Sequence, residues 1–161
     1  MKHKYTHSSK EPDYNDVESD LILDDIEEED YLPNAQILCY PVISLTDKDI
    51  AHKGSGQNLL GDDFEKMGAL FDTQNLVSDK TPPAFIWHNA TDGVVNVLNS
   101  FRFAEALKNN NIPVEMHIFP CGRHGMGLCD GQTQNDEEKK VFSHVSQWVP
   151  LFINWLDYIG F

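Results

Sequence analysis

Two side chains that could act together in proton transfer each follow an apolar run typical of a buried strand. Asp92 lies in the turn NATDG after the run at 84–88, and His124 lies in the loop CGRHGMG after the run at 114–119. A histidine acting as a general base needs an accessible ring and a carboxylate that fixes its tautomer. An Asp-Gly turn or a lone loop histidine is by itself a common surface feature, but the two in this order predict an acid and its base.

The segments around this pair predict a strand, a helix and a second strand that would bring the two side chains together. The helix is predicted over 97–109, between the strands at 84–88 and 114–119. Because neighbouring parallel strands end at the same edge of a sheet, we expect Asp92 and His124 to lie close in space. The face of the helix that is expected to be buried carries Leu98, Phe101, Ala104 and Leu107.

Further elements are predicted on both sides of this unit. Residues 36–44 predict a strand covered on both faces, 44–61 a loop rich in turn formers, and 62–71 a short helix. A last helix is expected to begin near Asp136, and Pro150 should either kink it or begin a second helix at its first turn. The apolar stripe of this last segment consists of Val141, Val145, Trp148, Phe152 and Trp155.

The alternation of strands and helices predicts the α/β class, with a parallel sheet between layers of helices. The sheet has only three predicted strands, and the aromatic last helix needs a larger surface to cover. The chain is therefore expected to be one end of a larger sheet. Residues 1–30 form an acidic, polar segment that is expected to be poorly ordered, and residues 31–161 are expected to form the folded part.

Charge and composition argue against several kinds of partner. The 161 residues include 26 acidic and 12 basic ones, and the net charge of −14 disfavours binding to nucleic acid or an anionic membrane. No apolar run is long enough to span a membrane, and the first residues lack the apolar core of a secretory signal, so a cytoplasmic location is expected. Cys39, Cys121 and Cys129 are expected to be free thiols, with zinc the disfavoured alternative. No cofactor or metal is predicted.

Several segments, taken in order, resemble the C-terminal half of an α/β-hydrolase. They are ILCYPVISL, HKGSGQNLLG, TPPAFIWHNATDGVVNV, NSFRFAEALKNNNIPVEMHIFPCGRHGMGL and the closing helix, within about residues 31–161. The resemblance is to prolyl-oligopeptidase-like and carbohydrate-esterase-like hydrolases, which include acetyl-xylan and feruloyl esterase relatives. It implies a partial α/β-hydrolase fold with three layers. It also implies that Asp92 is the acid of an Asp-x-x-Val-Pro pattern, with Asn96 in place of the proline, and that His124 is the base of a Gly-x-His-Gly pattern.

The resemblance also implies a nucleophile that this sequence does not contain in the family's form. The family's serine lies in a Gly-x-Ser-x-Gly elbow upstream of the acid, and no such pentapeptide occurs here. Ser55, in KGSGQ, has glycines at the adjacent positions and resembles a non-catalytic loop of the family. The His-Gly-Gly type of oxyanion turn is absent as well, so we expect an incomplete triad of Asp92 and His124.

Two functions of different classes are therefore predicted. The first is a serine-type carboxylic ester hydrolase that acts on a small ester or an acylated carbohydrate. This chain would supply its C-terminal portion and would have negligible activity by itself. The second is a non-catalytic remnant that binds a partner, or forms a homo-oligomer, through an exposed sheet edge. A flavodoxin-type anion-binding domain is disfavoured because no glycine-rich phosphate loop follows the first strand. The other histidines, including His88, are not expected to be catalytic.

Overall fold

A parallel sheet with the strand order β1-β2-β3 positions the site. The computed structural model describes residues 32–130 and 138–161, and the described residues from Pro33 onward belong to one unit. The strands are β1 (Gln36–Cys39), β2 (Ala84–Asn89) and β3 (Val114–Phe119). Every residue of β2 is buried, as expected of a parallel strand that is covered on both faces. The predicted parallel sheet is confirmed, whereas the predicted segment 1–30 lies outside the described residues.

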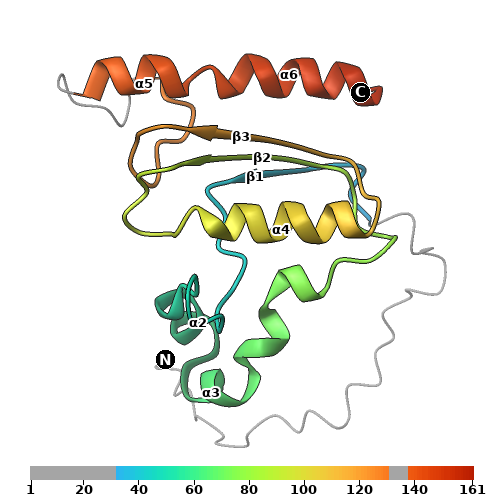
Figure 1. The fold of residues 1–161 in the computed structure, drawn as a ribbon, viewed down its shortest axis with the longest axis vertical. Helices are drawn as coiled ribbons and strands as arrows, with labels where there is room; N and C mark the ends of the chain where they lie inside the picture. Colours follow the sequence, from blue (N-terminus) through green and yellow to red (C-terminus); the bar gives the residue numbers. More distant parts are fainter. Residues whose placement is uncertain (1–31, 131–137) are drawn as a thin grey trace, which may run out of the picture. The chain divides into compact units, whose positions relative to one another are not determined.

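Helices cover both faces of this sheet, as Figure 1 shows. Helix α4 (Leu98–Asn109) lies on one face, and α5 (Lys139–Val145) and α6 (Trp148–Ile159) lie on the other. Pro150 lies in the first turn of α6, where a residue without an N–H group loses no helical hydrogen bond. The predicted second helix at Pro150 is thus confirmed, while the predicted helix start near Asp136 lies outside the described residues.

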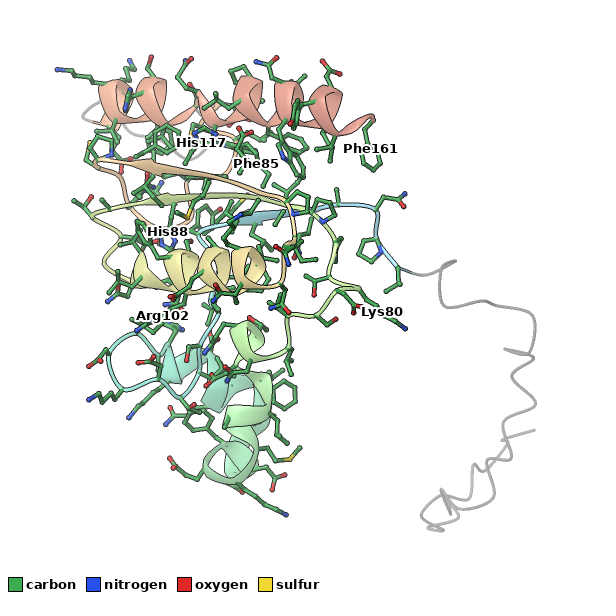
Figure 2. The ribbon with its side chains drawn as sticks, turned by 45° about the vertical axis from the view of Figure 1, so that its right-hand side comes forward. Lys80, Phe85, His88, Arg102, His117 and Phe161 are labelled. Atoms are coloured by element: carbon green, nitrogen blue, oxygen red, sulfur yellow. The ribbon has the colours of Figure 1, made fainter. Side chains whose placement is uncertain are left out.

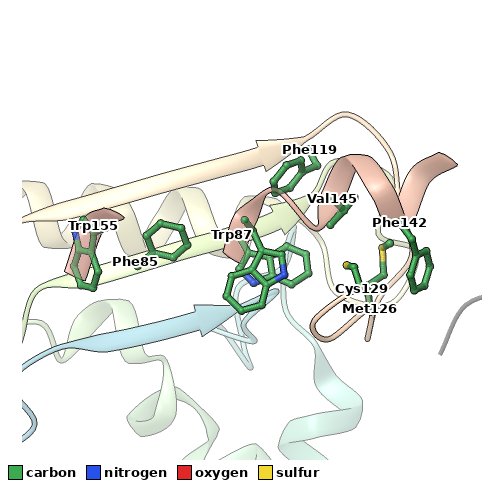
Figure 3. Packing of buried hydrophobic residues seen from close by; sticks show 9 residues of the cluster. Phe85, Trp87, Phe119, Met126, Cys129, Phe142, Val145 and Trp155 are labelled. Atoms are coloured by element: carbon green, nitrogen blue, oxygen red, sulfur yellow. The ribbon is translucent and has the colours of Figure 1, made fainter. Parts of the chain in front are cut away.

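The larger core lies between the sheet and the helices α5 and α6 (Figure 3). Trp87 of β2, labelled in Figure 3, is fully buried. Its ring stacks on that of Trp148 of α6, with ring centroids 5.3 Å apart and planes inclined by 16°. Large aromatic side chains such as these bury more apolar area than any others. The stripe predicted for the last helices packs here, which confirms that prediction. Its members are buried or partly buried: Val141, Val145, Trp148, Phe152 and Trp155.

Helix α4 buries only part of the face that its apolar spacing predicted: Leu107 is buried in the core and Ala104 packs against it, as predicted. Leu98 and Phe101 were expected to be buried, but they are 47% and 44% exposed. The buried face consists of Asn99, Ser100, Phe103 and Leu107. Oδ1 of Asn99 accepts hydrogen bonds from the backbone N–H groups of Ile43 and Ser44, and Nδ2 donates to the carbonyl of Ile50. Because buried backbone groups need partners, this polar side chain faces inward.

The first strand is shorter and more exposed than predicted. The strand expected over 36–44 ends at Cys39, because Tyr40 adopts a φ of 42° and Pro41 has no N–H group to donate. Ile37 is 44% exposed, so the expectation that this strand is covered on both faces is wrong. Within the described residues β1 pairs only with β2 and forms an edge of the sheet.

A helix replaces part of the loop predicted for 44–61. Helix α2 (Lys53–Leu60) is capped by His52, whose ring Nδ1 accepts from the backbone N–H of Ser55 at 3.3 Å. Gly56 lies inside this helix because the ring of Phe64 occupies the space that a side chain would need. The glycine that indicates a turn in the sequence therefore serves close packing.

The short helix predicted over 62–71 is divided into three helical turns. They are η2 (Gly61–Asp63), α3 (Phe64–Met67) and η3 (Gly68–Phe71). A further turn, η4 (Thr73–Asn75), follows in the connection to β2. In the part of the chain that the structure describes, no helix is both long and apolar enough to cross a membrane.

Candidate active site

The structure brings Asp92 and His124 together beyond the C-terminal ends of β2 and β3. Oδ2 of Asp92 lies 2.8 Å from Nδ1 of His124, a hydrogen-bonding distance. The carboxylate side chain is fully buried, whereas the imidazole is 29% exposed. Because Nδ1–H donates to the carboxylate, Nε2 carries the lone pair that a general base needs. The expected proximity is therefore observed, and the catalytic role of the pair stays a prediction.

The carboxylate of Asp92 is also held by the turn in which it lies. Oδ1 accepts hydrogen bonds from the backbone N–H groups of Val94 at 2.9 Å and Val95 at 3.0 Å. Burial raises the pKa of the Asp92 carboxyl, but these two amides and the His124 ring outweigh it, so the pKa lies below its ordinary value of 3.8. Asp92 is therefore ionised at neutral pH, and the two backbone hydrogen bonds of the turn orient its carboxylate so that Oδ2 faces His124.

The loop that carries His124 is attached to the end of β2. The hydroxyl of Thr91 donates to the carbonyl of Gly122 and accepts from its N–H, both at 3.0 Å. The side-chain Nδ2 of Asn89 donates to the carbonyl of Arg123 at 3.0 Å. Gly122 has a φ of 147°, and a Cβ at this position would lie 2.6 Å from the Asn89 amide. Only glycine therefore allows the loop to come this close to β2.

The ring of Tyr40 lies beside the imidazole of His124, a contact that sequence reasoning did not predict. Its ring centroid lies 4.6 Å from that of His124 at an interplanar angle of 65°, an edge-on contact. Its hydroxyl accepts from the N–H of Gly127 at 3.4 Å. Tyr40 adopts a positive φ of 42°, which is strained for a residue with a side chain. The strained residue directly after β1 thus contacts the candidate base.

His88 contacts the same oxygen of Asp92 as His124 does. It is the fifth residue of β2 and is fully buried, and its Nε2 lies 3.2 Å from Oδ2 of Asp92. Burial lowers the pKa of the His88 imidazole below its ordinary value of 6.5, although Val95 and Asp92 act in the opposite direction. His88 is therefore neutral at physiological pH. The sequence signal that could have found this contact is the spacing of four residues between His88 and Asp92.

We expect the lowered pKa of His88 to make the folded chain acid-sensitive. Between that pKa and 6.5 the unfolded chain binds the extra proton, so stability falls as the pH drops below about 6.5, by up to ~1.4 kcal/mol per pH unit. Asp92 adds a second loss below 3.8, because its folded pKa is also lowered. Urea unfolding between pH 7.5 and 5 measures the first slope.

The substitution His88→Gln should flatten this slope, because glutamine does not titrate. His144→Gln is the matched control, since His144 is an exposed histidine of α5, and it should leave the slope unchanged. Equal slopes in the wild type and in His88→Gln would contradict the assignment to His88.

Ser55 and Ser100 have hydrogen-bond partners other than His124, and burial keeps the Cys129 thiol protonated at neutral pH. The hydroxyl of Ser55 lies 2.8 Å from Nδ1 of His52, and the buried hydroxyl of Ser100 lies 2.8 Å from Nδ1 of His88. Burial, together with Asp130, raises the pKa of the Cys129 thiol to about 11, so little thiolate forms at neutral pH. In the described ranges, no three His, Cys, Asp or Glu side chains are grouped so as to hold a metal ion.

The chain is similar to known carbohydrate-active hydrolases. Residues 40–150 match the prolyl oligopeptidase family. The chain is 40% identical over 101 residues to an acetylxylan esterase of Xylanibacter ruminicola. This aligned stretch is 60% of this chain and 21% of that protein. The chain is also 39% identical over 101 residues to endo-1,4-beta-xylanase B of Butyrivibrio fibrisolvens. Here the aligned stretch is 62% of this chain and 16% of that protein.

Solved structures agree with this family in fold. An acetyl ester-xyloside bifunctional hydrolase from Caldicellulosiruptor lactoaceticus is 42% identical with a TM-score of 0.68, over 80% of this chain and 43% of that one. A carboxylesterase from Lactobacillus plantarum is 30% identical with a TM-score of 0.65, over 79% of this chain and 45% of that one. The chain thus spans less than half the length of these relatives, and its three strands are part of an α/β-hydrolase sheet. By the match over residues 40–150, the chain belongs to the prolyl oligopeptidase family.

Proposed function

We propose that this chain supplies the acid and the base of a serine-type carboxylic ester hydrolase that acts on acylated carbohydrate. The observation that carries the proposal is the 2.8 Å hydrogen bond between Nδ1 of His124 and the buried carboxylate of Asp92. It leaves Nε2 of a partly exposed imidazole as the proton acceptor. The likeness to an acetylxylan esterase and to an acetyl ester-xyloside hydrolase supports acetyl esters of xylan-type sugars as the substrate class.

In the proposed reaction, Nε2 of His124 takes the proton of a serine hydroxyl as the serine oxygen attacks the acyl carbonyl. The negative charge of Asp92 stabilises the imidazolium that forms. The imidazolium then gives this proton to the sugar oxygen as the bond between that oxygen and the acyl carbon breaks. The sugar departs as an alcohol, and the acyl group stays on the serine as an ester. Water attacks this ester in the same way, with His124 again accepting and returning the proton, and releases the carboxylic acid.

The serine in this scheme comes from a segment outside the sequence of this chain. The sequence has no Gly-x-Ser-x-Gly elbow, and the family's elbow lies upstream of the acid. Preorganised oxyanion donors, which contribute a large part of the rate of acyl transfer, would come from the same segment. We therefore infer that the chain alone has negligible esterase activity, and that it becomes active when the nucleophile-bearing part is supplied.

Supplying that part in a separate polypeptide tests the proposal. The full chain is co-expressed with the N-terminal portion of the Caldicellulosiruptor lactoaceticus hydrolase that it does not match, and turnover of p-nitrophenyl acetate is measured. We expect activity that a fluorophosphonate abolishes in the mixture, and none in either part alone. Turnover by this chain alone that is lost on fluorophosphonate treatment would show that the nucleophile lies within it. A complex that forms but does not react with the fluorophosphonate would also contradict the proposal.

A second candidate function is that of a binding or self-associating module. The observation that favours it is the edge strand β1, where Ile37 is 44% exposed. Beside this strand lies a hollow of about 310 Å³, whose apolar lining includes Leu38, Val77 and Phe103. An uncovered edge of this kind pairs readily with another strand. Sedimentation of the chain, alone and with the nucleophile-bearing portion, distinguishes the two functions. A dimer that persists when that portion is added would favour the self-associating module.

A further inference from the structure

We propose that His88 is a positioning residue that holds the carboxylate of Asp92 toward His124 and connects it to helix α4. This inference rests on the proposed role of Asp92 as the partner of the base. Nε2 of His88 lies 3.2 Å from Oδ2 of Asp92, the same oxygen that contacts His124. Figure 2 shows His88 between the sheet and α4. Both the His88 and the Asp92 side chains are fully buried, so water cannot replace this contact.

The partners of the His88 ring fix its tautomer. Nε2 also lies 3.1 Å from the carbonyl oxygen of Val95, and a carbonyl oxygen can only accept, so Nε2 must carry the hydrogen. Nδ1 is then unprotonated and accepts from the hydroxyl of Ser100 at 2.8 Å. The Nε2–H group thus lies between two acceptors, the carbonyl of Val95 and Oδ2 of Asp92. Both contacts require the same neutral tautomer, which burial also favours.

Hydrogen bonds and the close His88–Asp92 contact together form a ring around the acid. His88 faces the carbonyl of Val95, while the N–H of Val95 donates to Oδ1 of Asp92 at 3.0 Å. Oδ2 then accepts the Nδ1–H of His124 and lies 3.2 Å from Nε2 of His88. Through Ser100 the ring is attached to α4, whose first turns hold Asn99 and Ser100 buried. The carboxylate therefore cannot rotate away from His124 without breaking a contact to β2 or to its own turn.

This role differs from that of an ordinary core histidine in what it predicts for other residues. A core histidine contributes packing, and its loss lowers stability without a specific effect on the titration of Asp92. A positioning histidine stabilises the ionised carboxylate, so the loss of its N–H group raises the pH at which Asp92 titrates. The charged groups that face the His88 ring are Asp92 and, when protonated, His124, and both can be followed by NMR without any ester turnover.

The first measurement needs no variant. Nitrogen-15 imidazole spectra of the full chain are recorded from pH 5 to 8. We expect His88 to be the neutral Nε2–H tautomer at neutral pH, to titrate only below 6.5, and to show a slowly exchanging ring proton. An Nδ1–H tautomer, or a ring that titrates in the upper part of this range, would overturn the proposal. Because this readout does not depend on a nucleophile, it distinguishes failure of this inference from failure of the proposed esterase function.

Two substitutions complete the test. His88→Leu removes the donor, and we expect the carboxyl of Asp92 to titrate about one pH unit higher than in the wild type. His88→Gln retains an N–H group close to the position of Nε2, and we expect it to restore most of that shift. An unchanged Asp92 titration in folded His88→Leu would overturn the proposal. If His88→Leu does not fold, Ser100→Ala is used instead, and the Nδ1 signal of His88 should then shift. The ring of His117, which lies 2.8 Å from Glu115, is the control, and its signal should not shift.

Discussion

We expect the substitution Asp92→Asn to lower kcat of the hydrolase reassembled from this chain and a nucleophile-bearing portion by about 10³–10⁴-fold. The amide keeps the shape of the carboxylate, and its oxygen can still accept from Val94 and Val95. Its NH₂ group, however, would face Nδ1 of His124 and favour the tautomer with the hydrogen on Nε2. That tautomer cannot accept the serine proton, and no negative charge is left to stabilise an imidazolium. Steady-state turnover of p-nitrophenyl acetate measures the effect.

The matched control is a second histidine–carboxylate pair in the same sheet. Glu115 and His117 of β3 are also 2.8 Å apart, but they are both partly exposed and belong to no proposed relay. Glu115→Gln should leave kcat within about twofold, because a partly exposed pair contributes little. His124→Gln should be at least as damaging as Asp92→Asn, and the double variant should be hardly worse than either alone, because the two act as a unit. An Asp92→Asn enzyme with more than a tenth of the wild-type kcat would contradict the role of Asp92.

The candidate pair could be predicted from the sequence because its geometry depends on local patterns. The strands that precede Asp92 and His124 are short apolar runs bounded by turn formers, and the helix between them ends at an asparagine cluster. A parallel arrangement then brings the two strand ends to one edge of the sheet. The structure shows these elements with nearly the predicted bounds, and the two side chains meet at hydrogen-bonding distance.

The residues that surround the pair could not be predicted in the same way, because their contacts join distant parts of the chain. Tyr40 contacts His124 from the end of another strand, and no local sequence pattern predicts its positive φ. His88 is close to Asp92 in sequence, but its second partner, Ser100, lies on a helix face that apolar spacing assigned to solvent. Apolar periodicity detects packing and is insensitive to buried hydrogen bonds, which is why the prediction for α4 is right for Ala104 and Leu107 and wrong for Leu98 and Phe101.

A buried carboxylate in the connection between η3 and β2 is the most consequential residue that local sequence patterns do not reveal. Asp72 is 4% exposed, and its oxygens accept from the hydroxyl of Ser44 at 3.0 Å and from the backbone N–H groups of Leu45 at 2.6 Å and Thr46 at 3.1 Å. The hydroxyl of Thr46 donates to its other oxygen. These partners precede Asp72 by 26 to 28 residues, so no local pattern links them. The carboxylate fixes the segment that Asn99 of α4 also holds at Ser44.

We therefore expect Asp72→Ala to lower the free energy of unfolding by about 3–5 kcal/mol, because it leaves several buried donors without an acceptor. Asp72→Asn keeps one acceptor oxygen and should cost about 1–2 kcal/mol. Asp79→Ala removes an exposed carboxylate from the same connection and should change stability by less than about 0.5 kcal/mol. Urea unfolding of the full chain at pH 7 measures all three. Equal stabilities of Asp72→Ala and Asp79→Ala would contradict this prediction. Water would then satisfy the donors of residues 44–46, and the hydrogen bonds to Asp72 and Asn99 would not be what holds this segment against α4.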